Sequence, residues 1–357
     1  MSGEIERDAA ERGLDGVLGA TSSELEEIVS AMGHPAYRAA QIYDWIHAKG
    51  VTDPERMTNL PADLRAALSA RPVVPATKGR VLRSKDGTRK LEVFLEDGAA
   101  VETVLIPEGD KLTQCVSSQV GCAVGCEFCR SGKFGLGRNL TTSEIIAQVV
   151  LAREEYEPGE TLRNIVMMGV GEPLHNVERV ARALDRFCDP DGMGLSWRRV
   201  TVSTVGVPRG IDRLGELTKG RAALAISLHA SDDEVRRRLV PGVKATIAEI
   251  VAALRRYPLP RRMRYTIEYV MVKGVNDSDS DARNLVRVLS GLRVKINLLP
   301  INPHDLTDLE PPTSERVARF QEILVSKGMS AFLRKRRGDD INAACGQLLS
   351  PSSVQRI

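Results

Sequence analysis

The sequence is poor in aromatic residues, which make up 4% of its 357 positions. Extensive base stacking on aromatic side chains is therefore not expected. The sequence has no run of about 18 apolar residues, the length that a membrane span needs. The charged first 18 positions do not have the pattern of a signal peptide. We therefore expect a cytoplasmic protein. The net charge of only +3 excludes a uniformly basic nucleic-acid coat protein but allows a local basic face.

Six cysteines are too few for a disulfide scaffold in a chain of this length. Three of them, Cys122, Cys126 and Cys129, have C-x₃-C-x₂-C spacing on one short stretch. This spacing is typical of a [4Fe–4S] cluster with one iron left open, because such clusters usually take four cysteines. The alternative is a structural zinc site with Cys115 or Cys345 as fourth ligand. We favour iron–sulfur because only one C-x₂-C pair is present.

The chain divides into five predicted parts. These are a flexible N-terminus at 1–20, a helical accessory domain at 21–75, a β-hairpin extension at 76–111, a large domain at 112–349 and a tail at 350–357. Strand and helix patterns alternate in the large domain, which predicts parallel strands joined by helices. The fold class is therefore α/β, with a partial (βα)₆ barrel. Its strands are expected at 112–117, 164–168, 200–203, 222–227, 265–271 and 295–299.

Residues suited to catalysis or ligand binding follow five of these six strands. In a βα barrel the carboxyl ends of the strands meet at one rim, where active sites form. We therefore expect the active site at this rim. The segments concerned are Cys122–Cys129, Gly171-Glu172-Pro173, Ser203-Thr204, Ser227-Leu228-His229 and Pro300-Ile301-Asn302-Pro303.

Four longer strings resemble those of one enzyme family. They are CVSSQVGC at 115–122, MMGVGEPL at 167–174, ISLHA at 226–230 and RGDDINAACGQL at 337–348. Together they resemble the RlmN/Cfr family of radical S-adenosylmethionine (SAM) RNA adenine methyltransferases, in the family's order over residues 22–348. The resemblance implies a radical SAM partial barrel that uses one [4Fe–4S] cluster and SAM.

The resemblance also assigns site residues. Cys122, Cys126 and Cys129 would hold the cluster. SAM would lie against Gly171, Glu172, Ser203, Ser227, Leu228, His229 and Asn302. Cys345 would take a methyl group from one SAM, and a radical made from a second SAM would abstract hydrogen from that methyl group. The resulting carbon radical would add to adenine, whose carbon 2 is too electron-poor for ordinary methylation.

Two further residues would finish that reaction. Cys115 would form a disulfide with Cys345 and so release the base, and Glu102 would accept the ring proton. Each residue also has an ordinary structural interpretation. Cys345 could be a small buried apolar residue, and Glu102 could be an exposed acid on a strand.

The implied substrates are a peptidyl-transferase-centre adenosine of 23S rRNA and the adenosine 3′ of the anticodon in tRNAs, methylated at carbon 2. The alternatives are carbon-8 methylation of the rRNA adenosine, as in Cfr-type members, a zinc-stabilised RNA-binding protein without catalysis, and a radical SAM enzyme acting on a small molecule. An electron donor such as flavodoxin or ferredoxin is implied, and we expect a monomer without membrane contact. The basic stretches 334–337 and 255–264 are either phosphate contacts or solvated faces.

Overall fold

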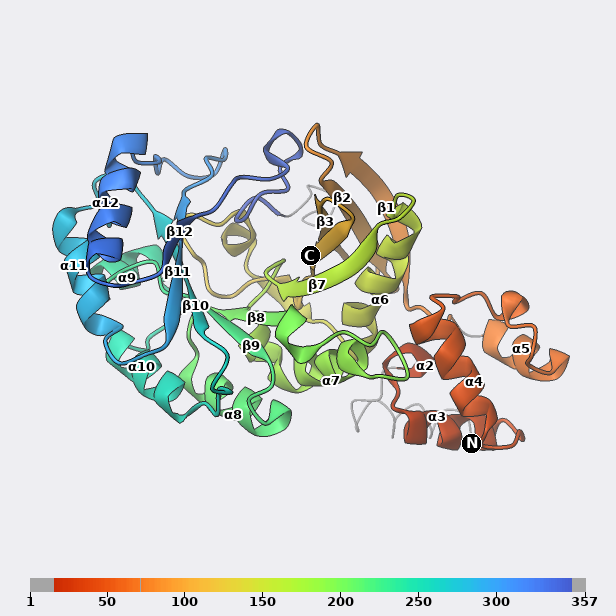
Figure 1. Ribbon diagram of the computed structural model, residues 1–357. Helices are drawn as coiled ribbons and strands as arrows, with labels where there is room; N and C mark the ends of the chain where they lie inside the picture. Colours follow the sequence, from red (N-terminus) through yellow and green to blue (C-terminus); the bar gives the residue numbers. More distant parts are fainter. Residues whose placement is uncertain (1–15, 71, 349–357) are drawn as a thin grey trace.

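The computed structural model describes residues 16–70 and 72–348. The predicted tail and most of the predicted flexible N-terminus lie outside these residues. The described chain forms a curved sheet with helices along its outer side, and a group of N-terminal helices lies beside it (Figure 1). No helix within the described ranges has both the length and the apolar character needed to cross a bilayer.

The main sheet has ten strands in the described part of the chain, and they follow one another in chain order. Neighbours are antiparallel from β1 to β4 and parallel from β4 to β12. The strands β1 and β12 form the two edges, so the barrel is partial. The strands are β1 (Ala76–Arg83), β2 (Arg89–Leu95), β3 (Ala100–Glu108), β4 (Lys111–Cys115), β7 (Thr161–Met167), β8 (Val200–Thr204), β9 (Ala223–Ser227), β10 (Tyr265–Met271), β11 (Val294–Pro300) and β12 (Ala331–Leu333).

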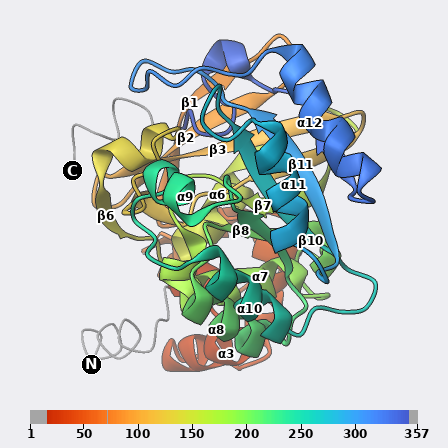
Figure 2. The same ribbon diagram turned by 90° about the vertical axis from the view of Figure 1, so that its left-hand side faces the viewer.

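Helices connect the parallel strands and cover the outer side of the sheet (Figures 1 and 2). They are α6 (Thr142–Ala152), α7 (Val177–Cys188), α8 (Pro208–Thr218), α9 (Asp233–Leu239), α10 (Ile247–Arg256), α11 (Asp279–Val288) and α12 (Ser314–Ser326). Capping boxes at Thr141, Thr246 and Ser278 start α6, α10 and α11, because each hydroxyl accepts a hydrogen bond from the main-chain N–H three residues later. The predicted α/β fold and all six barrel strands are confirmed, with ends shifted by a few residues.

The N-terminal helices share one hydrophobic core with the barrel, to which Leu18, Leu25 and Ile42 contribute. They are α2 (Gly16–Gly19), α3 (Ser22–Ala31), α4 (Arg38–Tyr43) and α5 (Ala62–Ser69), and a π-helical turn (Asp44–Ala48) continues α4. Polar contacts add to this packing. The Tyr43 hydroxyl donates to Asp189 Oδ2 at 2.6 Å.

Buried His47 makes this packing sensitive to pH. Burial, followed by the charges of Arg186 and Arg153, lowers its pKa from 6.5 to about 3. The unfolded chain therefore binds a proton below pH 6.5 that the folded chain rejects, so stability is lost as pH falls. At about 1.4 kcal/mol per pH unit, the loss between pH 7 and pH 5 is about 2 kcal/mol. We expect urea denaturation to show that His47→Gln escapes this loss, and an equal loss in both proteins would contradict the assignment.

A C-terminal strap, defined here as residues 334–348, crosses from the β12 edge back to the turn between β1 and β2. Asp340 accepts hydrogen bonds from the Ser84 hydroxyl at 2.5 Å and from the Lys85 main chain at 3.2 Å. The main-chain N–H of Gly338 donates to Asp86 at 3.1 Å. The strap therefore bridges the two edges of the partial barrel.

Candidate active site

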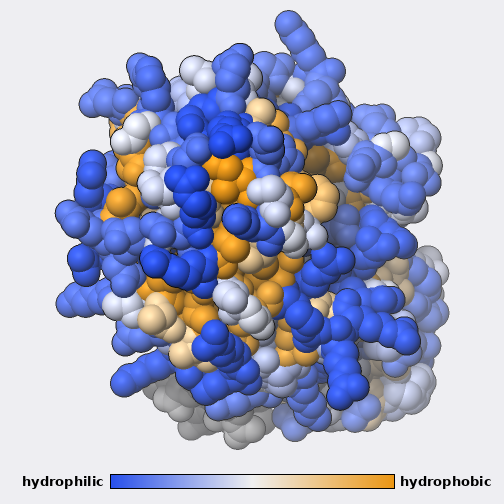
Figure 3. All heavy atoms as spheres, turned by 60° about the vertical axis from the view of Figure 1, so that its left-hand side comes forward, coloured by the Kyte–Doolittle hydropathy of each residue, from blue (hydrophilic) through white to orange (hydrophobic). Residues whose placement is uncertain are grey.

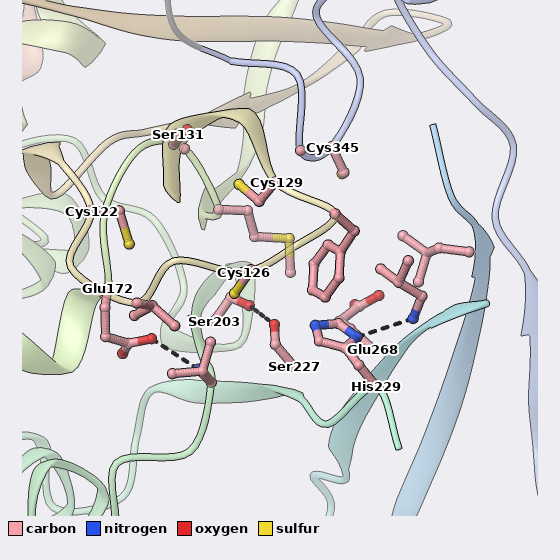
Figure 4. Close-up of a pocket in the computed structure, with 18 of the residues that line it drawn as sticks. Cys122, Cys126, Cys129, Ser131, Glu172, Ser203, Ser227, His229, Glu268 and Cys345 are labelled. Atoms are coloured by element: carbon pink, nitrogen blue, oxygen red, sulfur yellow. Dashed lines mark hydrogen bonds between the residues drawn. The ribbon is translucent and has the colours of Figure 1, made fainter. Parts of the chain in front are cut away.

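A cavity lies at the carboxyl ends of the barrel strands, as predicted from the rim residues. With its open mouth it encloses about 1000 Å³, enough for a nucleoside-sized ligand. Ten of the thirteen predicted site residues line it (Figure 4). They are Cys122, Cys126, Cys129, Gly171, Glu172, Ser203, Ser227, His229, Asn302 and Cys345. The remaining three, Glu102, Cys115 and Leu228, lie outside its lining.

The lining is largely apolar between these polar groups. Met167, Phe128, Val270 and Ile301 all contribute to it. Figure 3 shows an apolar area gathered in the middle of one face of the molecule and framed by hydrophilic side chains. A ligand with both a polar chain and a flat apolar ring is suited to such a lining.

The three clustered cysteines lie on one loop that the short strands β5 (Gln119–Gly121) and β6 (Leu136–Asn139) hold at its base. Burial raises the pKa of Cys122 to about 12 and that of Cys126 well above its usual value. Within the described residues, no three Cys, His, Asp or Glu side chains are placed to bind a single metal ion. Three thiols at this spacing on one loop fit the irons of a [4Fe–4S] cluster.

Glu172 is fixed at the end of β7 by main-chain donors. Its Oε1 accepts from Leu174 N–H at 2.9 Å, and its Oε2 accepts from Val205 N–H at 2.8 Å. Burial raises the pKa of Glu172, and these hydrogen bonds oppose the rise. The preceding Gly171 has φ +105°, and a Cβ there would lie 2.6 Å from Gln119 Cβ, so a side chain has no room.

His229 faces the cavity as a neutral ring. Burial lowers its pKa to about 3, and its Nδ1 accepts a hydrogen bond from Val270 N–H at 3.0 Å. The ring proton is therefore on Nε2. The edge of the ring contacts Phe128, with 4.6 Å between centroids. The neighbouring Leu228 side chain is 1% exposed and belongs to the hydrophobic core, so it packs away from the cavity.

A buried arginine that the sequence did not reveal lies behind the cavity wall. The Arg236 side chain on α9 is 2% exposed and donates to the carbonyls of Ser227 at 3.2 Å and Leu228 at 2.6 Å, and also to that of Val205. Burial raises the pKa of Cys126, and the charge of Arg236 opposes that rise. Arg236 thus binds the ends of β8 and β9 together and adds a positive charge near the cysteine loop.

Cys345 is an exposed free thiol on the strap, and it lines the cavity. Its carbonyl accepts from the Asn302 side-chain amide at 2.9 Å. The next residue, Gly346, accepts from Arg130 N–H at 2.7 Å, which ties the strap to the cysteine loop. A Cβ on Gly346 would lie 2.9 Å from the Phe128 carbonyl oxygen, so this close approach needs glycine. The exposed position of Cys345 in the cavity is not that of a buried apolar residue.

Cys115 and Glu102 lie side by side beneath the strap. Cys115 ends β4 and pairs with Val104 of β3, and Glu102 is two positions from Val104, so both side chains are on one face of the sheet. Burial, and next the nearby charge of Cys345, raises the pKa of Cys115 to about 12. Lys90 Nζ lies 3.1 Å from Glu102 Oε1, and it donates to a carbonyl of the strap. Glu102 is 1% exposed, so it is not the exposed strand acid of the alternative interpretation.

The two basic stretches lie at opposite ends of the barrel. The stretch 334–337 follows β12 at the rim, and Arg334 lines the cavity. The stretch 255–264 ends α10 and precedes β10, which places it at the amino ends of the strands. Only the first stretch borders the site.

Sequence reasoning missed Glu268, Arg334 and Phe128 as cavity residues. Glu268 is 6% exposed in the middle of β10, and its Oε1 lies 4.0 Å from Arg334 Nη1. Burial raises the pKa of Glu268. An acid within the apolar run YTIEYVM was the available signal, since charged residues are rarely buried without a role.

Comparison with known proteins agrees with this geometry. The Radical SAM superfamily model matches residues 116–286, and the ribosomal RNA large subunit methyltransferase N-terminal domain matches residues 16–74. A dual-specificity RNA methyltransferase RlmN from Sorangium cellulosum is 50% identical, covering 90% of this chain and 92% of that protein. The chain belongs to the RlmN family.

Other RlmN relatives and one solved structure extend the match. The RlmN of Marinobacter nauticus is 46% identical, covering 93% of this chain and 92% of that protein. The crystal structure of a radical SAM methyltransferase from Sphaerobacter thermophilus is 46% identical, covers 93% of this chain and 98% of that chain, and has a TM-score of 0.89. As an RlmN-family member the protein is a radical SAM methyltransferase that uses a [4Fe–4S] cluster and SAM. The alternative of a non-catalytic zinc protein is therefore wrong.

Proposed function

We propose that this protein methylates carbon 2 of an adenosine in the peptidyl-transferase centre of 23S rRNA and of the adenosine 3′ of the anticodon in tRNAs. One observation carries the proposal: Cys345 lies in the cavity of the three clustered cysteines and near Cys115. The RlmN relatives are named dual-specificity RNA methyltransferases, which supports two RNA substrates.

The residues present fit the cofactors. Cys122, Cys126 and Cys129 would hold the cluster, and Glu172, His229 and Asn302 are among the residues that would hold SAM. The buried Asn302 Oδ1 makes no hydrogen bond with any described residue, so a ligand donor would satisfy it. When bound, the cluster and SAM supply an electron and a 5′-deoxyadenosyl radical, a reactivity that no side chain provides.

Cys345 is suited to carry the methyl group because it is exposed within the cavity. Its sulfur would form a bond to the methyl carbon of SAM as the sulfonium–carbon bond breaks and S-adenosylhomocysteine leaves. The thiol proton must leave first. Burial raises the pKa of Cys345, and the charge of Arg334 opposes that rise. After loss of a hydrogen atom, the methylene carbon on Cys345 would bond to carbon 2 of the adenine.

Glu102 and Cys115 would then release the product. The Glu102 carboxylate would take the proton from the substituted ring carbon, and the ammonium of Lys90 would hold that carboxylate in place. The Cys115 sulfur would bond to the Cys345 sulfur while the bond from that sulfur to the methylene carbon breaks. That electron pair would stay with the base, which would take up the proton released by the Cys115 thiol to complete the methyl group. The one electron spent in forming the radical would have to leave the adduct again, back to the group that supplied it.

The partners follow from this chemistry. The target adenine must leave its stack to enter the cavity, and the basic stretch 334–337 at the rim is placed to neutralise nearby phosphates. A low-potential electron donor such as flavodoxin or ferredoxin would reduce the cluster. We propose that the protein acts as a monomer in the cytoplasm, where its RNA substrates and free thiols are found.

The proposal is tested with anaerobically reconstituted protein, SAM, dithionite and either an rRNA fragment or tRNA. Mass spectrometry of the digested nucleosides should show 2-methyladenosine with both RNAs. Production of 8-methyladenosine instead would overturn the assigned carbon. Absence of any methylated adenosine, while SAM is still cleaved, would overturn the RNA substrate and favour a small-molecule substrate.

A further inference from the structure

A row of polar side chains crosses four adjacent strands of the barrel interior. Ser203 on β8 and Ser227 on β9 have their hydroxyl oxygens 3.4 Å apart. Ser227 is in register with Glu268 on β10, and Glu268 is in register with Asn297 on β11. The Asn297 amide donates to Glu268 Oε1 at 2.9 Å. The row thus continues past the two serines predicted to contact SAM.

Glu268 is the incomplete member of this row. Its side chain lines the cavity beside His229 (Figure 4) and is 6% exposed. Oε1 has the Asn297 amide as a partner, whereas the buried Oε2 makes no hydrogen bond with any residue that the structure describes. An unmet buried acceptor is costly, so a donor from a ligand in the cavity would be favoured there.

The position of Glu268 indicates which part of SAM would supply that donor. Glu172 and the cysteine loop mark the β7 side of the cavity, where the methionine part would lie. The Phe128 and His229 rings offer flat surfaces to adenine. The ribose joins these two parts, so its hydroxyls would face the intervening strands. Carboxylates accept hydrogen bonds from ribose hydroxyls in other nucleotide sites.

We propose that Glu268 binds the ribose hydroxyls of SAM through its Oε2. The inference rests on the SAM site proposed above. Within that site Glu268 accepts the hydroxyl protons in hydrogen bonds, Asn297 fixes the rotamer of the carboxylate, and Arg334 balances its charge. Glu268 therefore contributes to affinity for SAM and does not take part in bond breaking.

The test is a binding cycle on the anaerobically reconstituted holoenzyme, measured by titration calorimetry. The two ligands are S-adenosylhomocysteine and its 2′,3′-dideoxy analogue, and the two proteins are wild type and Glu268→Gln. We expect wild type to lose about tenfold in affinity when the hydroxyls are removed, as for a hydrogen bond to a charged group. We expect Glu268→Gln to bind the parent ligand about tenfold more weakly than wild type, and to bind both ligands within about twofold of each other.

The controls separate the possible failures. Asp185→Asn, an acid on the outer helix α7 whose pKa burial also raises, should bind both ligands like wild type. Equal losses for wild type and Glu268→Gln on removing the hydroxyls would overturn the inference and leave the proposed SAM site intact. Failure of wild type to bind S-adenosylhomocysteine would instead overturn the proposed SAM site. If Glu268→Gln does not fold, equal affinity of wild type for the two ligands still overturns the inference.

Discussion

Alanine in place of Cys115 should trap the RNA on the protein. The Cys345 thiol can still accept a methyl group and bond to adenine in this variant, but the partner thiol that breaks the tether is gone. We expect a covalent protein–RNA species on a denaturing gel, and release of methylated RNA should fall by at least about a thousandfold. Cys345→Ala should form neither the adduct nor the product, because it has no sulfur to carry the methyl group.

A matched control is present in the same chain. Cys188 at the end of α7 is also a buried free thiol, and it is not in the cavity lining. Cys188→Ala should methylate RNA within about twofold of wild type, since the small apolar replacement leaves the site unchanged. Normal release of methylated RNA by Cys115→Ala would contradict the role given to Cys115.

Methionine in place of Arg236 should destabilise the protein by about 3 kcal/mol. The guanidinium donates to three main-chain carbonyls at the ends of β8 and β9, and methionine fills similar space without any donor. Each unmet buried carbonyl costs about 1 kcal/mol or more. Urea denaturation of the cluster-free protein measures the change in the free energy of unfolding.

Arg237 on the same helix provides the comparison. Its side chain is exposed, so Arg237→Met should change the free energy of unfolding by less than about 0.5 kcal/mol. Equal effects of the two substitutions would mean that the Arg236 hydrogen bonds contribute nothing to stability. The cluster content of the reconstituted protein, measured by its visible absorption, should fall only in the Arg236 variant.

The barrel was predictable because its pattern is strong over long segments. The alternation of apolar strands and amphipathic helices predicts the ends of the six barrel strands β4 and β7 to β11 to within a few residues of their observed positions. Short elements were not predictable. The helix α9 and the pair β5 and β6 carry too few residues for a periodic signal. Glu268 was missed because one acid in an apolar strand signals a role but does not tell which face of the sheet it occupies.

The closeness of Cys115 and Cys345 could not be read from their spacing in the sequence. The two cysteines are separated by most of the large domain, and only the family resemblance placed them together. In the structure Cys345 lies near Cys115 because hydrogen bonds from the strap to the β1–β2 turn and to the cysteine loop hold that part of the chain at the rim. Such contacts depend on tertiary packing, which local propensity does not encode.

The strap also determines when the reactive thiol is put in place. The contact between Ser84 and Asp340 joins positions 256 residues apart, and closing so long a loop becomes favourable only after the intervening barrel has formed. During synthesis, the chain can therefore assemble the cysteine loop and the cavity floor before Cys345 arrives. A nascent or partly folded molecule would hold the cysteine loop and the cavity without Cys345, so on the mechanism proposed above methyl transfer would begin only when folding is complete.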